Sequence, residues 1–388
     1  MRYSVYDTGR QIPRTSIQIR KIIVKHIKEK KVELIELFYD LIYVYAISRM
    51  TMLIEEPTGG TIPLSGFFRY LIVSFVILQA WLYLTNYINR YGQWEWWEFG
   101  ITCVNMTATV YMTNTISLDW GGMAATFNLS MLVMLLCVAA MYFIQTVRQK
   151  QDTGAAKNSL LILTVDCTLY LCAFIVSLTS AGQAVLWLDV AAVLVGAFLP
   201  FFIRGNFDKS IINFPHLAER FELITIITFG EAIVGMTEYF DVHHFSLKPI
   251  LVFAVLLGLF GGYVVQIHYL MEHERSERAL RLMFGHYFVV ISLNLLTVAL
   301  KLIHSTEMNS VALAVMIAAS LTVFYLSIMA NSSYYKDSVS FTGADVLKMV
   351  VPAACGFGVI FLLKRSVYGV LIETLIVSAG EFVIPIIK

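Results

Sequence analysis

Residues 247–270 read LKPILVFAVLLGLFGGYVVQIHYL, and this stretch decides the fold. It contains one Lys or Arg, Lys248, and no Asp or Glu. An α-helix rises 1.5 Å per residue, so about 20 apolar residues cross the hydrocarbon core of a bilayer, which is about 30 Å thick. The stretch also lacks the period-two alternation of a membrane β-strand. It therefore predicts a helix that spans a membrane.

Similar apolar runs recur along nearly the whole chain, bounded by charged residues, glycine or proline. Hydrophobic residues make up 58% of the sequence and charged residues 14%, against about 45–50% and about 25% in soluble domains. The fold class is therefore an all-α polytopic membrane protein with about twelve transmembrane helices. The predicted spans are 34–54, 67–89, 99–117, 123–146, 159–179, 183–203, 217–237, 247–270, 279–303, 308–331, 344–363 and 367–387.

The positions of the basic residues predict the orientation. Cytoplasmic loops close to a membrane carry an excess of Lys and Arg. With twelve spans and a cytoplasmic N-terminus, 22 of the 28 Lys and Arg residues fall on the cytoplasmic side. We therefore expect both termini in the cytoplasm. The loops near 55–66, 118–122 and 238–246 should then lie outside.

The first 33 residues form a basic cytoplasmic segment without the apolar core of a signal peptide. Between positions 17 and 31, isoleucines alternate with Lys and Arg. Such a pattern is typical of a helix that lies on an anionic membrane surface. A solvated basic tail that only fixes the topology explains it equally well.

Two similar openings, six spans apart, indicate an internal repeat. Span one opens with Glu36-Leu-Phe and span seven with Glu219-Arg-Phe, each near the cytoplasmic end. Units with an even number of spans keep the same orientation, so the two halves should be parallel repeats related by an axis along the membrane normal. A chance match of two short motifs is the alternative. The predicted organisation is a first six-helix repeat over 34–203, a linker over 204–216 and a second repeat over 217–388.

Ionisable residues inside the spans are candidates for a functional site, because each costs about 2.5–3.5 kcal/mol to insert. Glu36 and Asp40 are four residues apart and share one face of span one. Two carboxyl groups this close suit a proton or cation site. A position of Glu36 near the helix start, where it complements the helix dipole, is the structural alternative.

Span seven carries Glu219, Arg220, Glu222 and Glu231. We expect Glu231 close to the membrane midplane, where it faces a cavity shared with Asp40; a buried structural hydrogen bond is the alternative. His286 in span nine is expected nearby, because histidine can shuttle protons. The candidate intramembrane ion, proton or substrate site is therefore Glu36, Asp40, Glu219, Arg220, Glu222, Glu231 and His286. Asp166, Asp189 and Glu373 have no explanation at this level.

The sequence contains no phosphate-binding loop, no dinucleotide fingerprint and no zinc-ligand spacing. We therefore expect no cofactor, no metal site and no nucleic-acid partner. Membrane lipids are the predicted partners, together with a small molecule or ion that the residues do not identify. Association of copies into a homo-oligomer is left open.

These motifs resemble those of the low temperature requirement protein A (LtrA) family. The resemblance rests on Glu36-Leu-Phe-Tyr-Asp40-Leu, on His216-Leu-Ala-Glu219-Arg220-Phe221-Glu222-Leu223 and on Phe229-Gly230-Glu231. It extends to Trp81-Leu-Tyr-Leu-Thr-Asn86 with Asn89-Arg90, and to Gly285-His286-Tyr287. Tyr39, Glu222 and Phe229 depart from the usual Phe, Gly and Leu. The resemblance implies a protein of the bacterial plasma membrane linked to growth in the cold, with no settled biochemical activity.

Three functions compete on this evidence. A transporter or channel-like protein is favoured, because many carriers build their site between two repeats. Deep acidic residues favour H⁺ or a cation over an anion. An intramembrane enzyme that uses Glu231, Asp40 and His286 on a lipid substrate is the second possibility, although no nucleophile or metal cluster supports it. A non-catalytic protein of membrane homeostasis is the third.

Overall fold

The structure is a computed structural model. It describes residues 30–148, 154–179, 182–203, 211–237, 240, 243, 245–275, 277–339 and 342–386. The expected surface helix over 17–31 lies almost entirely outside the described residues, and so does the first part of the expected linker, 204–210.

All regular elements in the described residues are helices, and twelve of them are α-helices. Each coincides with one of the spans predicted from apolar runs. The first half contains α2 (Leu34–Thr51), α3 (Leu64–Tyr91), α4 (Trp96–Thr115), α5 (Trp120–Arg148), α6 (Gly154–Ser177) and α7 (Gly182–Phe202). The second contains α8 (Phe214–Met236), α9 (Leu247–Tyr263), α10 (Leu280–Lys301), α11 (Ser310–Met329), α12 (Gly343–Leu363) and α13 (Val367–Ile386).

The chain is a multi-pass membrane protein by the length and composition of its helices. Nine helices in the described residues are long and apolar enough to cross a bilayer. The remaining three are α4, α8 and α13. Helix α8 is less apolar than the nine because it carries four charged residues, Glu219, Arg220, Glu222 and Glu231.

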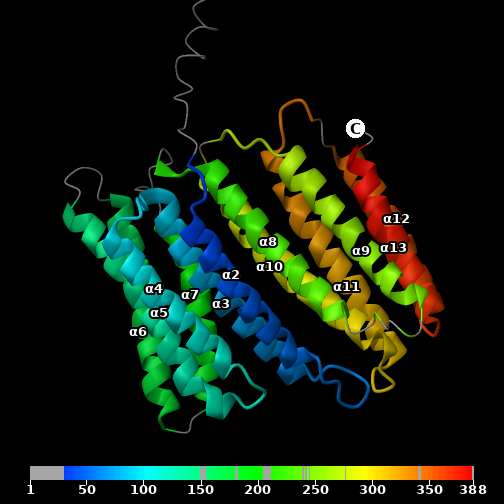
Figure 1. The fold of residues 1–388 in the computed structure, drawn as a ribbon, viewed down its shortest axis with the longest axis horizontal. Helices are drawn as coiled ribbons and strands as arrows, with labels where there is room; N and C mark the ends of the chain where they lie inside the picture. The colour runs from blue at the N-terminus through cyan, green and yellow to red at the C-terminus, as the bar shows by residue number, and fades with distance from the viewer. Residues whose placement is uncertain are drawn as a thin grey trace, which may run out of the picture.

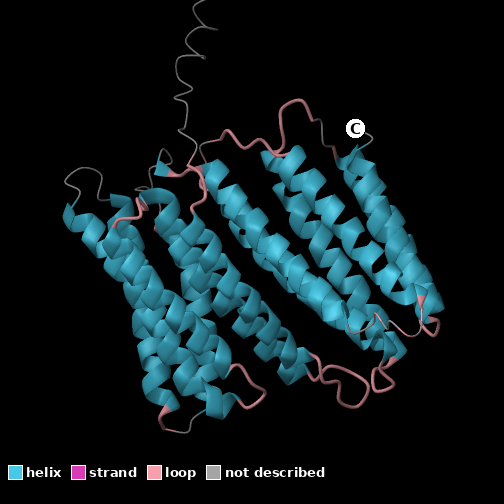
Figure 2. Ribbon diagram, viewed as in Figure 1, coloured by secondary structure: helices cyan, strands magenta, loops and turns pink. Residues whose placement is uncertain are grey.

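The helices lie side by side, and their connections gather at the two ends of the bundle (Figures 1 and 2). We call the end at which α2 begins the proximal end and the opposite one the distal end. Both ends of the described chain lie at the proximal end, as expected for an even number of crossings (Figure 1). The predicted outside loops near 55–66 and 118–122 lie together at the distal end.

Pairs of neighbouring helices recur six helices later along the chain. Helix α2 packs on α4 and α4 on α5, just as α8 packs on α10 and α10 on α11. The pairs α3 with α7 and α6 with α7 recur as α9 with α13 and α12 with α13. Contacts between the first six helices and the last six are made chiefly by α2, α3, α8 and α10.

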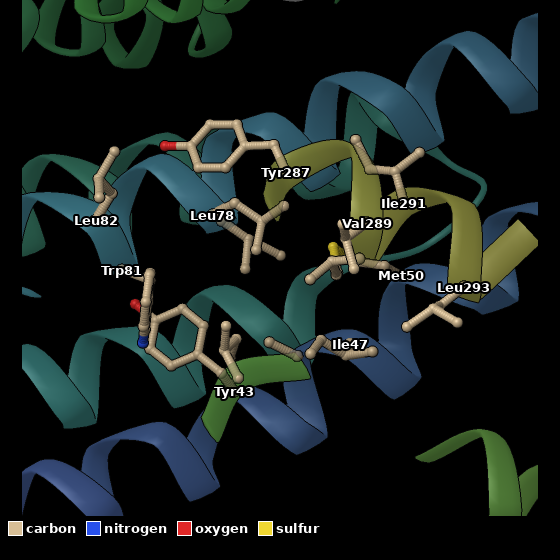
Figure 3. Close-up of a cluster of buried hydrophobic side chains, with 14 of the residues drawn as sticks. Tyr43, Ile47, Met50, Leu78, Trp81, Leu82, Tyr287, Val289, Ile291 and Leu293 are labelled. Atoms are coloured by element: carbon tan, nitrogen blue, oxygen red, sulfur yellow. The ribbon is translucent and has the colours of Figure 1, made fainter. Parts of the chain in front are cut away.

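The core between the two sets of helices is apolar and aromatic (Figure 3). Tyr43 and Met50 of α2 lie in it with Trp81 of α3 and Val289 of α10, and all four are at most 1% exposed. The Tyr70 hydroxyl on α3 also donates a hydrogen bond of 3.1 Å to the carbonyl oxygen of Ile291 on α10. Because lipid is as apolar as these side chains, close packing and such hydrogen bonds hold membrane helices together.

Candidate functional site

The residues that cap α2 and α8 fix how far four ionisable residues lie from the proximal end of the bundle. Glu33 caps α2 and Asn213 caps α8, where its side chain accepts a hydrogen bond from the His216 amide. Counted from these caps, Glu36 and His216 stand at the third position. Asp40 and Arg220 stand at the seventh. The two helices run in the same direction, so two acids on α2 meet two bases on α8 at matching levels.

Arg220 binds both acids. Its Nε and Nη2 atoms donate to Oδ2 and Oδ1 of Asp40 at 3.0 and 2.6 Å. Its Nη1 atom donates to Oε2 of Glu36 at 2.5 Å. Paired donors that face one carboxylate fix geometry as well as charge. Arg220 is thus the cation between the two carboxyl groups.

Two indole groups donate further hydrogen bonds to these acids. Trp81 Nε1 donates to Oδ1 of Asp40 at 2.7 Å, and Trp94 Nε1 donates to Oε1 of Glu36 at 3.2 Å. The Arg220 guanidinium also lies 5.6 Å from the centre of the Trp81 ring. We call Glu36, Asp40, Trp81, His216 and Arg220 the α2–α8 network, and each of its members is at most 1% exposed.

His216 links the network to the proximal end. Its Nδ1 atom accepts a hydrogen bond of 3.1 Å from the Asn89 side chain, so the proton of the neutral ring lies on Nε2. Nε2 is 3.0 Å from Oε2 of Glu36, but the angle is not that of a well-formed hydrogen bond. His216 therefore joins Glu36 to Asn89 on α3.

Lys30 lies at the proximal end of the bundle, outside the spanning segments. Its ammonium donates to the carbonyl oxygens of Ile88 and Gly92, the latter at 2.8 Å, where α3 ends. A cation is favourable at this end of a helix. Burial lowers the pKa of Lys30, against the opposing effect of the acids Glu36 and Glu98.

The structure brings together three of the seven predicted site residues, namely Glu36, Asp40 and Arg220. Glu219 is exposed and lies on another face of α8. Glu222 lies 3.2 Å from Nδ1 of His268, at the proximal end of the bundle. These two acids do not join the network.

Glu231 lies far from Asp40 along the bundle. Glu231 lies five residues before the end of α8, eleven residues beyond Arg220, which is about 16 Å along the helix. Its surroundings are Ser48 on α2 and the Glu55 and Lys301 pair, whose Oε1 and Nζ atoms are 2.9 Å apart. Glu231 therefore belongs to the distal end and does not share a cavity with Asp40.

His286 is also separate from the carboxylates. Its Nδ1 atom donates to the Leu282 carbonyl at 2.7 Å, and its Nε2 atom accepts from the Tyr263 hydroxyl at 2.9 Å. The Phe221 ring lies between the His286 ring, at 4.8 Å, and the Trp81 ring, at 5.1 Å. His286 thus packs behind the network without touching its acids.

Two members of the network, His216 and Trp81, were not among the predicted site residues. Both stand inside motifs that carry the family resemblance. The signal that could have found His216 is its spacing of four residues from Arg220, which repeats the spacing of Glu36 and Asp40. Nothing comparable in the sequence points to the Trp81 indole as a donor to Asp40.

A second acidic group, which sequence reasoning left unexplained, lies inside the first half. Asp166 on α6 and Asp189 on α7 are both 0% exposed. The Tyr83 hydroxyl donates to Oδ2 of Asp166 and accepts a hydrogen bond of 3.0 Å from Gln79. Tyr170, one turn beyond Asp166, is within electrostatic reach of both aspartates. We call Gln79, Tyr83, Asp166, Tyr170 and Asp189 the inner acidic group.

Several polar atoms of this group lack partners. Oδ1 of Asp166, both carboxylate oxygens of Asp189 and the Tyr170 hydroxyl have no well-formed hydrogen bond to another described residue. The Asn128 side chain is close enough to Asp189 to donate a hydrogen bond to it, although the geometry is not that of a well-formed one. No ion pair within the described residues includes either aspartate.

A cavity of about 640 Å³ adjoins the inner acidic group. It lies between α3, α7 and α10, and Gln79, Tyr83 and Gly196 form part of its wall. None of Asp40, Glu231 and His286 lines it. Among the described residues, no group of three His, Cys, Asp or Glu side chains is arranged to hold a metal ion.

The sequence matches the model of the bacterial low temperature requirement A protein (LtrA) family over residues 31–380, nearly the whole chain. The chain belongs to this family. The predicted resemblance is therefore confirmed. In this LtrA family member, the two most specific motifs supply Glu36, Asp40, His216 and Arg220, the ionisable members of the α2–α8 network. A search of curated proteins gave no match.

Proposed function

We propose that the chain is a transporter or channel-like protein for H⁺ or a small cation, and that the inner acidic group is its intramembrane site. The observation that carries the proposal is the pair of buried aspartates, Asp166 and Asp189, which have unpartnered oxygens behind a cavity wall that includes Tyr83. A carboxylate in a membrane interior is retained where it meets water, a proton or a cation. Tyr83 connects Asp166 to the cavity wall.

The chemistry of the inner acidic group suits a cation or a proton. Carboxylate, hydroxyl and amide oxygens are the ligands that hard cations prefer. Asp166, Asp189 and Tyr170 provide such oxygens without a competing Lys or Arg in an ion pair of the described residues. A proton can instead neutralise either aspartate. Both occupants remove the cost of a buried charge.

The α2–α8 network has a different role in this proposal. Arg220 already neutralises much of the charge of Glu36 and Asp40, so these acids have little capacity left for a transported cation. They hold the first helices of the two halves together. The functional site is therefore assigned to Asp166 and Asp189, with the network as the link between the halves.

Flux through the purified protein tests the proposed site. We expect wild-type protein in liposomes to pass H⁺, Na⁺ or K⁺ above the empty-liposome background. Asp166→Asn and Asp189→Asn should reduce this flux to background, because the substitution removes the charge and breaks no ion pair. Internal pH-sensitive or cation-sensitive dyes measure the flux, with Glu222→Gln as a matched acid outside the group. Wild-type flux at background for every cation, or full flux in both Asn variants, would contradict the proposal.

We also propose that all twelve helices span the plasma membrane as two parallel six-helix repeats, with both termini in the cytoplasm. The recurring helix neighbours support the repeats, and the basic residues support the orientation. Helices α4 and α8, which are more polar than the nine, bury several of their polar side chains, as expected for polar spans. Helix α8, for example, buries Arg220 and His216 completely.

Single cysteines test this topology. In a background without the five native cysteines, Thr58→Cys and Ser117→Cys at the distal end should react with an impermeant maleimide added to intact cells. Gln93→Cys at the proximal end should react only after permeabilisation. All three positions are exposed, so accessibility on the correct side is not limiting. Labelling of Gln93→Cys in intact cells would reverse the orientation, and equal labelling of all three would refute the span count.

A further inference from the structure

We infer that the cavity between α3, α7 and α10 binds an anionic phospholipid of the surrounding bilayer. This inference goes beyond the proposed function and does not depend on it, because lipid binding can be measured without ion flux. Three features of the cavity carry it, namely its length, its opening and the charges at its proximal end.

The cavity is longer than one membrane leaflet is thick. On α3 its lining runs from Phe68 to Arg90. That distance is about 33 Å at the rise of an α-helix, close to the hydrocarbon thickness of about 30 Å. Most of the wall is apolar or aromatic, as an acyl chain requires. The phenylalanines of this wall are Phe68, Phe75, Phe198, Phe201, Phe284 and Phe288.

One side of the cavity opens toward the bilayer. Leu194 and Phe198 of α7 are 49% and 55% exposed, and Phe288 of α10 is 43% exposed. All three line the cavity and also reach the outer surface of the bundle. Because that surface faces lipid in a membrane protein, an acyl chain can enter sideways without crossing water.

Two guanidinium groups mark the proximal end of the cavity. Arg90 at the end of α3 and Arg278 just before α10 both belong to its lining. Arg90 donates to the Ser159 hydroxyl at 3.4 Å and Arg278 donates to the Pro200 carbonyl at 3.3 Å. A guanidinium has five N–H donors, so it can keep a protein partner and bind a phosphate. The arrangement therefore matches a lipid phosphate at one end and acyl chains beyond it.

The charges and the apolar wall together distinguish an anionic phospholipid from other ligands. A soluble anion would gain nothing from the long apolar wall, and a neutral lipid would gain no charge-assisted hydrogen bond from Arg90 and Arg278. In the proposed topology the proximal end faces the cytoplasm, so the lipid belongs to the inner leaflet. Phosphatidylglycerol is a suitable probe.

Binding of phosphatidylglycerol to the purified full-length chain in a mild detergent tests the inference. Native mass spectrometry and thermal stabilisation should both detect one bound lipid, in preference to phosphatidylcholine. The Arg90→Gln/Arg278→Gln double variant should bind it about tenfold or more weakly, the loss expected when charge-assisted hydrogen bonds to a phosphate are removed. The matched control is Arg148→Gln/Arg281→Gln, which removes two arginines at the same end that do not line the cavity.

A second variant tests the apolar wall. Ala197→Trp fills the cavity beside α7 while both arginines remain, and it should also abolish lipid binding. Competition by glycerol phosphate would assign the site to a free phosphate, and equal binding of phosphatidylcholine would remove the role of charge. Either result, or unchanged affinity in both cavity variants, would overturn the inference. Loss of lipid binding in both cavity variants supports it, and the arginine double variant, which leaves the inner acidic group unchanged, separates this result from any change in ion flux.

Discussion

Arg220→Gln should unfold most of the protein at temperatures that wild type withstands. The substitution leaves Glu36 and Asp40 buried and close together without the cation that now joins them. Breaking a buried ion pair by removal of one partner costs about 3–5 kcal/mol. Here one residue serves two acids, so we expect the upper part of this range. Thermal unfolding in detergent, followed by size-exclusion chromatography, measures the loss.

Removal of the acids should restore much of that stability. In the triple variant Glu36→Gln/Asp40→Asn/Arg220→Gln no charge remains in the network, and amide groups can replace part of the hydrogen bonding. Arg220→Lys should rescue only in part, because an ammonium cannot make the paired contacts of a guanidinium with Asp40.

The control for this experiment is Arg148→Gln, which breaks the ion pair of Arg148 with Glu95 at 2.5 Å. Both side chains are about half exposed, and surface ion pairs of this kind contribute little to stability because water screens them. Arg148 lowers the pKa of Glu95 through their hydrogen bond, but solvent screens that interaction. Equal stability of Arg148→Gln and Arg220→Gln would show that the network does not hold the halves together.

The positions of the helices could be predicted from the sequence because hydropathy is a local property. Each predicted apolar range coincides with an α-helix, although the ends differ by a few residues. Helix α8, for example, begins at Phe214 and not at 217, since Asn213 caps it. Caps depend on single hydrogen bonds, which a count of apolar residues does not detect.

The contacts between helices could not be predicted in the same way. Spacing along α2 placed Glu36 and Asp40 on one face, and that part is correct. Their partner Arg220 is 180 residues from Asp40, and nothing local shows which helix faces them. The expected proximity of Glu231 to Asp40 failed for the same reason, because the neighbour of Glu231 is Lys301 from α10.

The inner acidic group depends on a glycine that the sequence does not distinguish from the others. Gly196 on α7 faces Gln79, Tyr83 and Asp166, and a Cβ atom there would overlap Gln79 Nε2 and the Tyr83 hydroxyl. It would also lie 2.7 Å from Oδ2 of Asp166. A hydrogen atom at this position is what allows α7 to approach the group closely.

Gly196→Ala should therefore abolish ion flux, because the added methyl group forces Tyr83 away from Asp166 and narrows the adjoining cavity. Overpacking of this kind also costs about 1–3 kcal/mol, so thermal unfolding should show a moderate loss while the protein remains folded. The matched control is Gly230→Ala in α8, where an added Cβ meets nothing within 4 Å. Alanine stabilises a helix interior by about 1 kcal/mol relative to glycine, so the control should keep its flux and gain stability. If both variants conduct equally, the close approach of α7 has no part in transport, and the inner acidic group is a structural feature of the first half.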